Sequence, residues 1–223
     1  MADRSYLDDF FWLDPLGVAE SDLAIVDDGM SYEEIQCPAD VGHRRPGRRI
    51  GPLRVVLQSK TMADFVWTGE GDLLVNDRVR KALASNEFTG YELYRAVVRE
   101  DEGSAIDPSL WEVVVKGSAG FASPESGVRV VDGCSVCGHV TYSVPTDMHK
   151  LILRSAWDGS DFFLVWPLPR YIFVSRRVAS LLKDRSFSGI SVLPIAELSF
   201  EPNGTLTSGP RESWAPVRVE APD

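Results

Sequence analysis

The chain has 223 residues and a net charge of -10, with 44% hydrophobic and 25% charged side chains. This balance is typical of globular proteins and excludes wholesale disorder. Apolar runs such as residues 162–168 are too short to span a bilayer, and the N-terminus does not resemble a secretory signal. Three cysteines do not make a disulfide framework, so we expect a cytoplasmic protein.

The first 34 residues carry most of the negative charge. Ten acidic side chains and one arginine give this segment a net charge of -9. We predict that it packs on the body of the protein, and that it repels nucleic acid and attracts a basic partner. The alternative is a solubilising face without a partner. The candidate partner-binding residues are Asp8, Asp9, Asp14, Asp27 and Asp28.

A basic run follows, with four arginines around a Pro-Gly turn at residues 44–49. Such a run could grip phosphates. It lacks the interleaved aromatic residues of single-strand binders, and the simpler interpretation is a solvated turn that pairs with the acidic segment. We therefore expect no nucleic-acid partner.

A pattern of residues recurs 99 positions along the chain. The first copy begins at Phe65-Val66-Trp67 and ends near Gly90, and the second begins at Leu164-Val165-Trp166 and ends near Gly189. The register holds for about thirty residues without a gap. This pattern indicates a duplicated unit, in which Trp67 and Trp166 are equivalent core aromatics.

Each copy predicts a strand, a helix and a second strand. The expected strands are 72–75 and 91–97 in the first copy, and 171–174 and 190–193 in the second. Asn76 or Asp77 is the expected helix cap in the first copy, and Ser175 in the second. Strands are also expected at 53–58, 110–116 and 127–131, and a short helix at 147–155 with Thr146 as its cap.

No linker rich in Pro, Gly and Ser separates the two copies. We therefore predict the α+β class, with a single pseudo-symmetric domain at residues 35–198 and repeat copies at about 64–97 and 163–196. Residues 1–34 are the acidic segment, and residues 199–223 are a C-terminal tail with Trp214 as a candidate anchor.

All three cysteines lie just upstream of the two copies. Cys134 and Cys137 have the spacing with which two thiolates hold one tetrahedral ion, and Gly138 allows the sharp turn that follows. Cys37 occupies the position equivalent to Cys134. A structural zinc site has four protein ligands, so a fourth ligand is needed in addition to the three cysteines.

Three side chains are candidates for the fourth ligand, namely His43, Asp40 and His139. We prefer His43, because imidazole suits a thiolate-rich zinc site better than carboxylate. The predicted site is a zinc knuckle shared by the two repeats, with Cys37, His43, Cys134 and Cys137 as ligands. A redox pair is less consistent with the strand-like residues after Cys137, and inert core cysteines are the remaining alternative.

The signatures of common enzymes are absent from the sequence. It contains no G-x-S-x-G elbow, no P-loop and no G-x-G-x-x-G after a strand. His149 is expected to be exposed, and Asp158 and Asp161 are explained by turn chemistry. We therefore expect a protein that is not an enzyme.

These features resemble the bacterial, chiefly myxobacterial, double-CXXCG paralogous proteins, which are associated with toxin–immunity pairs. The resemblance rests on Cys37-Pro-x-x-x-Gly42-His43-Arg, on Cys134-x-x-Cys137-Gly138 and on the paired repeat segments, and it covers about residues 35–198. Asp40 stands where the first motif would have its second cysteine, so a four-cysteine site is excluded. The resemblance implies a small cytoplasmic immunity-type protein.

The leading hypothesis is a zinc-stabilised protein that binds and neutralises a bacterial toxin, such as a basic nuclease, through the acidic segment. The second is a nucleic-acid-associated protein that resembles a zinc ribbon. The third is an enzyme that uses the zinc as a Lewis acid.

Overall fold

The structure is a computed structural model, and it describes residues 9–15, 24–57, 62–100 and 109–208. Strands dominate it, and two α-helices accompany them, which confirms the α+β class. The helices are α1 (Asp77–Ala84) and α2 (Arg176–Arg185). Neither combines the length and the apolar character that a membrane-crossing helix needs in the described part of the chain.

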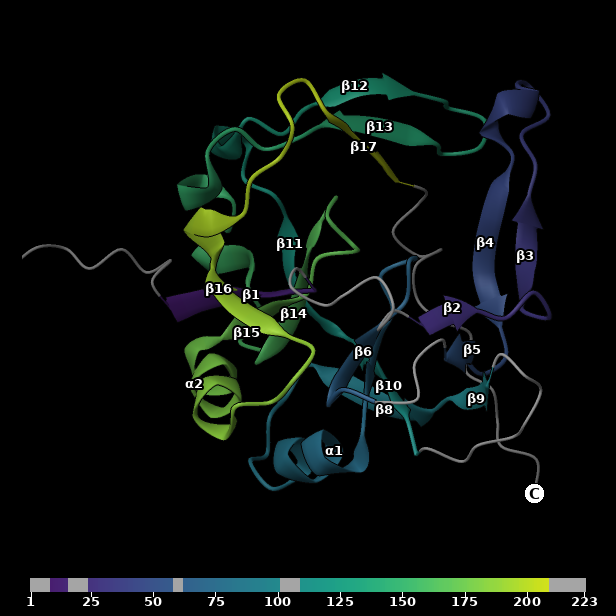
Figure 1. Ribbon diagram of the computed structural model, residues 1–223. Coiled ribbons are helices and arrows are strands. Elements are labelled where there is room, and N and C mark those ends of the chain that lie inside the picture. Colours follow the sequence, from purple (N-terminus) through teal and green to yellow (C-terminus); the bar gives the residue numbers. More distant parts are fainter. Residues whose placement is uncertain (1–8, 16–23, 58–61, 101–108, 209–223) are drawn as a thin grey trace, which may run out of the picture.

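Two sheets form the body of the molecule (Figure 1). The five-stranded sheet has the order β11 (Gly117–Phe121), β14 (Phe162–Trp166), β15 (Phe173–Ser175), β1 (Phe10–Asp14) and β16 (Ser191–Pro194). The four-stranded sheet has the order β6 (Phe65–Trp67), β7 (Leu73–Val75), β10 (Trp111–Val115) and β8 (Tyr91–Arg95).

Three smaller sheets complete the fold. The first contains β2 (Ala24–Val26), β5 (Arg54–Leu57) and β9 (Val97–Glu100), and the second contains β12 (Val130–Gly133), β13 (Val140–Ser143) and β17 (Thr205–Ser208). The third is the hairpin of β3 (Ser31–Ile35) and β4 (Arg45–Ile50). In Figure 1 this hairpin stands beside the body, and its tip meets the tip of the β12–β13 hairpin.

One hydrophobic core joins the two large sheets and both helices. It contains Leu73 and Val75 of β7, Val174 of β15, and the buried faces of α1 and α2. Val79 and Leu83 supply the buried face of α1, as their helical spacing predicts. Residues 62–95, with α1, and residues 160–194, with α2, are called the first and second lobes below, and they share this continuous interior. The absence of a linker between them is consistent with this.

Local signals correctly predict where the two α-helices begin, but the helix expected at 147–155 does not form. Asn76 caps α1, because its side chain accepts a hydrogen bond from the backbone N–H of Val79. Ser175 precedes α2, but its hydroxyl donates to Asp161 and makes no capping bond. The helix expected at 147–155 is replaced by two short 3-10 turns, Met148–Lys150 and Arg154–Ala156, and Asp147 caps the first of them.

The strand register corrects the gap-free alignment of the two copies. Phe65 lies opposite Val75, and Phe162 lies opposite Val174. Val75 and Val174 are 99 positions apart, whereas Phe65 and Phe162 are 97 apart. The segment between the two paired residues is two residues longer in the second copy, so Trp67 and Trp166 do not occupy equivalent positions.

The N-terminal and C-terminal segments both contribute strands. β1 pairs with β15 on one side and β16 on the other, so this part of the acidic segment lies inside a core sheet. β17 pairs with β13 and attaches the start of the tail. Trp214 and residues 217–219 lie outside the described residues.

Candidate metal centre

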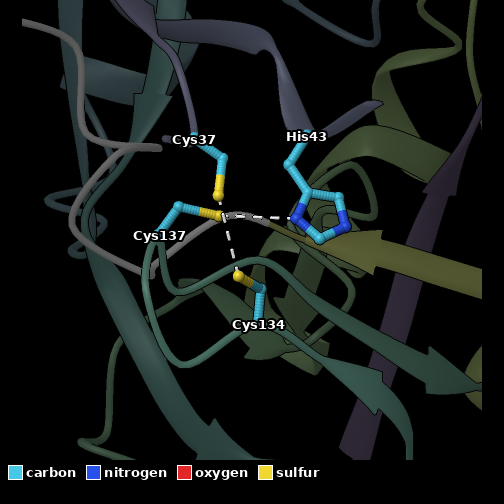
Figure 2. A group of neighbouring side chains, drawn as sticks. All are labelled: Cys37, His43, Cys134 and Cys137. Carbon is cyan, nitrogen blue, oxygen red and sulfur yellow. Dashed lines mark hydrogen bonds between the residues drawn. The ribbon is translucent and has the colours of Figure 1, made fainter. Parts of the chain in front are cut away.

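Four side chains converge where the tips of two hairpins meet (Figure 2). Cys37 and His43 lie on the connection between β3 and β4, and Cys134 and Cys137 lie on the connection between β12 and β13. Their ligand atoms all lie within 4.8 Å of one another. All three cysteines are free thiols.

The distances between the ligand atoms fit a tetrahedral metal ion. The Sγ atoms of Cys37 and Cys134 are 3.7 Å apart, and Cys137 Sγ lies 3.7 Å from Nδ1 of His43. Zinc–sulfur bonds of about 2.3 Å in a tetrahedron place two sulfur atoms about 3.8 Å apart. The cluster therefore has the donor set and the spacing of a metal site in which the protein supplies every ligand.

The local backbone explains how Cys134 and Cys137 come to face the same point. The N–H of Gly138 donates to the carbonyl of Cys134 at 3.0 Å, and the N–H of Cys134 donates to the carbonyl of His139 at 2.7 Å. Gly138 has a φ of 66°, which is the left-handed conformation that glycine adopts at no steric cost. The sequence prediction of a sharp turn at this glycine is confirmed.

The two other candidates for the fourth ligand lie beside His43. Asp40 caps the 3-10 turn Val41–His43 by accepting a hydrogen bond from the N–H of Gly42, and its other oxygen lies 3.5 Å from His43 Nε2. This is the arrangement in which a carboxylate orients a metal-binding imidazole. His139 stacks on the ring of His43, with ring centroids 4.5 Å apart.

The thiols differ in their pKa values. Hydrogen bonds from the backbone N–H groups of Cys137 and Val136 lower the pKa of Cys134 to about 6. Burial raises the pKa of Cys37 above its ordinary value. The contact with Cys134 raises the pKa of His43 more than burial lowers it.

Arg45 also contacts the cluster, and the sequence analysis did not identify it. Its guanidinium lies 3.9 Å from Cys137 Sγ and donates to the carbonyl of Cys137 at 3.1 Å. A positive charge beside a thiolate favours the ionised form that binds metal. Only the proximity of Arg45 to Cys37 and His43 in the sequence could have suggested this role.

The rest of the basic run is not a free cationic surface. Arg44 pairs with Glu34 at 2.5 Å, and Arg49 pairs with Glu112 at 2.6 Å. These ion pairs use the charges that phosphate binding would require. Residues 45–50 form the strand β4, so the prediction of a solvated turn is wrong, and the ion-pair partners of the run lie in β3 and β10.

The structure corrects the predicted acidic surface. Asp14 is 3% exposed and Asp27 is 6% exposed, because Asp14 ends a central strand and Asp27 is enclosed by Arg54 and Arg99. Asp14 is therefore not available to an exposed partner-binding face, and the carboxylate of Asp27 is already engaged in two ion pairs. Asp9 and Asp28 are exposed, and Asp8 lies outside the described residues.

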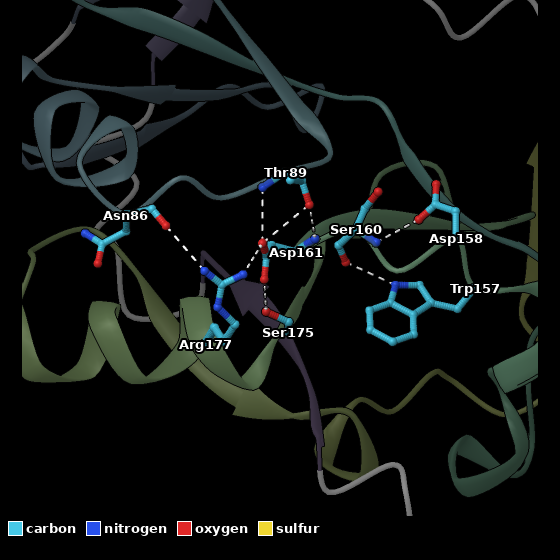
Figure 3. A network of polar contacts seen from close by, with 8 residues as sticks. All are labelled: Asn86, Thr89, Trp157, Asp158, Ser160, Asp161, Ser175 and Arg177. Atoms are coloured by element: carbon cyan, nitrogen blue, oxygen red, sulfur yellow. Dashed lines mark hydrogen bonds and ion pairs between the residues drawn. The ribbon is translucent and has the colours of Figure 1, made fainter.

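Asp161 is the centre of a second polar group, which joins the two lobes (Figure 3). Its carboxylate accepts hydrogen bonds from Thr89 N–H at 3.1 Å, from the Ser175 hydroxyl at 2.6 Å and from Arg177 at 3.0 Å. Arg177 also donates to the carbonyl of Asn86 at 3.3 Å. Asp161 was expected only as a turn residue, and that expectation missed its contacts with residues 72 positions away.

A matching group surrounds Asp64. Its carboxylate accepts from Ser188 N–H at 3.0 Å, from the Asn76 side chain at 3.0 Å and from Arg78 at 2.6 Å. Arg78 also donates to the carbonyl of Arg185 at 3.0 Å. Asp161 therefore binds Thr89 of the first lobe and Arg177 of its own lobe. In the same way, Asp64 binds Ser188 of the second lobe and Arg78 of its own lobe.

Comparison with known proteins adds nothing to this geometry, since no family model and no curated protein matches the sequence.

Proposed function

We propose that this protein is a cytoplasmic, zinc-stabilised binding protein of the immunity type, which neutralises a bacterial toxin by forming a complex with it. The observation that supports this proposal most is the donor set of the cluster. Three sulfur atoms and one imidazole supply all four ligands of a tetrahedral ion, as in structural zinc sites, whereas catalytic zinc keeps one position for water or substrate. The metal then stabilises a binding surface.

The charge of the chain supports a basic partner. The net charge is -10, and electrostatic complementarity accelerates association. Asp8, Asp9 and Asp28 remain candidates for contact with the basic partner. Asp14 is withdrawn from it because it is buried, and Asp27 because Arg54 and Arg99 already pair with its carboxylate.

Co-expression tests the toxin hypothesis. The product of the neighbouring open reading frame is expressed with and without this protein, and growth and complex formation are measured. We expect toxicity, rescue by this protein and a complex that survives size-exclusion chromatography. Absence of toxicity, or rescue without a complex, would contradict the proposal.

Elemental analysis of the purified protein tests the metal. We expect about one zinc per chain, and its loss in Cys37→Ser and Cys134→Ser. Glu125→Gln, at an exposed site nine residues before Cys134 and outside the cluster, is the control and should keep the metal. A protein that folds equally well without metal would contradict a structural zinc.

We also propose that the fold is a duplicated unit whose two halves have exchanged their first strands. β1 lies between β15 and β16, and β10 lies between β7 and β8. Phe11 faces Val174 and Pro194, and Trp111 faces Val75 and Arg95, so the partners of the two strands are 99 positions apart. The reciprocal groups around Asp64 and Asp161 support the same relation.

A further inference from the structure

A cleft of about 600 Å³ lies between the β3–β4 hairpin and the two large sheets. Tyr32, Arg45 and Arg49 line it from the hairpin, and residues 112–115 line it from β10. Pro169 and Arg170 of the other lobe close a further side. The Cys37, His43, Cys134 and Cys137 cluster lies between the tip of the same hairpin and the β12–β13 connection, so a metal bound there would fix one wall of the cleft.

Eight charged residues line this cleft, and three of them, Arg49, Asp72 and Glu112, lie together. Glu112 is only 5% exposed, and its Oε2 atom accepts a hydrogen bond from Arg49 at 2.6 Å. Asp72 lies 3.7 Å from the same guanidinium. Two carboxylates thus share one guanidinium, and this group has a net charge of -1.

The two carboxylate oxygens of Glu112 differ in their contacts, since only Oε2 is bonded to Arg49. Within the described part of the chain, Oε1 of Glu112 has no hydrogen-bond donor, although the residue lines the cleft. Burial raises the pKa of this carboxyl above its ordinary value despite the nearby Arg49. An acceptor on a side chain that lines a cleft is available to a ligand that enters the cleft.

The fold itself does not require a charge at this position. Glu112 faces Leu74 and Tyr94, and the residue with the corresponding partners in the other large sheet is Trp12, which faces Phe173 and Leu193. Trp12 is 6% exposed and belongs to a hydrophobic cluster. Since buried ion pairs are seldom more stabilising than apolar packing, stability alone does not explain Glu112 and Arg49.

We propose that this cleft binds a guanidinium or primary ammonium group, with the free oxygen of Glu112 and the carboxylate of Asp72 as its acceptors. A single positive charge neutralises the group of three. The ring of Tyr32, which is 40% exposed, offers a face for the cation at the mouth of the cleft.

An anionic ligand fits the cleft less well. Arg49 is already held by Glu112, and Arg45 is directed to the sulfur and carbonyl of Cys137. Arg170 lies 3.6 Å from Glu70 at the rim. The inference does not depend on the partner being a toxin, since the cation could be a free small molecule or a lysine or arginine side chain of any protein.

Binding of a matched pair of ligands tests the proposal. The full-length, zinc-loaded protein is titrated calorimetrically with N-acetyl-arginine amide and with N-acetyl-citrulline amide, which has the same shape without the charge. We expect saturable binding of the arginine compound and binding about tenfold weaker for citrulline. Equal affinity for the two compounds, or no saturable binding of the arginine compound, would overturn the proposal.

Variants locate the site. Glu112→Gln keeps the shape of the side chain and is expected to weaken binding about tenfold, whereas Glu92→Gln, on neighbouring β8 and outside the cleft lining, should leave it unchanged. Thermal unfolding checks that each variant folds. If Glu112→Gln does not fold, Asp72→Asn replaces it with the same expected loss. A folded variant at either position with wild-type affinity would refute the assignment.

A second pair of ligands distinguishes the two sources of the cation. Butylguanidinium represents a free small molecule, and acetyl-Gly-Arg-Gly amide represents a protein side chain with its flanking backbone. Tighter binding of the tripeptide identifies the cleft as a docking site for a partner's arginine, and tighter binding of butylguanidinium identifies a small-molecule site.

Discussion

Asp64 shows how a single buried carboxylate depends on its donors. Burial alone would raise its pKa, but hydrogen bonds from Ser188 N–H and Asn76 and the charge of Arg78 hold the pKa below its ordinary value. The unfolded chain therefore takes up a proton at this group at a higher pH than the folded protein does. Its contribution to stability is present above the pKa of the unfolded state and is lost as the pH falls through the folded pKa.

Asp64→Asn should consequently lower stability at neutral pH more than at acid pH. We expect a loss of about 1–3 kcal/mol near pH 6 and a smaller difference from wild type near pH 3. Urea unfolding at both pH values measures it, with the exposed Asp184→Asn as the control. A difference that does not depend on pH would show that ionisation of Asp64 is not what its partners stabilise.

The cysteines should differ in reactivity when the metal is removed. Because the pKa of Cys134 is about 6 and that of buried Cys37 is raised, we expect iodoacetamide at neutral pH to alkylate Cys134 roughly tenfold faster. Mass spectrometry of the peptides gives both rates. Added zinc should protect all three thiols, and unchanged labelling with zinc would argue against the site.

At the scale of elements, two glycines set how closely the lobes approach. Gly90 and Gly189 are 99 positions apart, and both have positive φ values, of 84° and 79°. A Cβ atom would lie 2.1 Å from the carbonyl oxygen of Phe162 at Gly90, and 2.1 Å from that of Phe65 at Gly189. Phe162 is the first residue of β14 and Phe65 is the first residue of β6, so each glycine lies against the start of a strand in the other lobe.

Replacing either glycine with alanine should therefore lower the free energy of unfolding by more than the positive φ angle alone accounts for. Gly159 has a φ of 87°, and a Cβ atom added there would have no other atom within 4 Å, so it is the matched control. We expect Gly159→Ala to cost about 1 kcal/mol, and Gly90→Ala and Gly189→Ala at least about 2 kcal/mol more. Chemical denaturation measures all three, and equal losses would contradict tight packing between the lobes.

On the scale of the whole molecule, the Cys/His cluster lies between two hairpins outside the main core. The body is held by the hydrophobic cluster shared by α1, α2 and the two large sheets, which contains none of the metal-binding residues. Metal loss should therefore loosen the hairpins before it unfolds the body. This distinguishes the protein from small zinc domains that unfold completely without metal.

Chelation of the metal tests this order. We expect faster hydrogen exchange at residues 31–50 and 130–143, retained protection in β7, β14 and β15, and an unfolding midpoint lower by on the order of 10 °C. Cys134→Ser should give the same pattern and should not respond further to the chelator. Loss of protection throughout the body would show that the metal stabilises the whole fold.

The sequence by itself determined features that depend on neighbouring residues. The cap at Asn76, the buried face of α1 and the turn at Gly138 follow from local propensity, and the α+β class follows from their alternation along the chain. The Cys134–Cys137 pair was recognisable for the same reason, since metal-ligand spacing within one turn is a local property.

Only the tertiary structure decided which distant residues meet. It placed β1 between β15 and β16, buried Asp14 and Asp27, and directed Asp161 to Thr89. It also set Arg49 against Glu112 in the cleft. Strand pairing and the burial of charge depend on long-range packing, in which any strand of suitable pattern can find several partners, so the sequence pattern cannot choose among them.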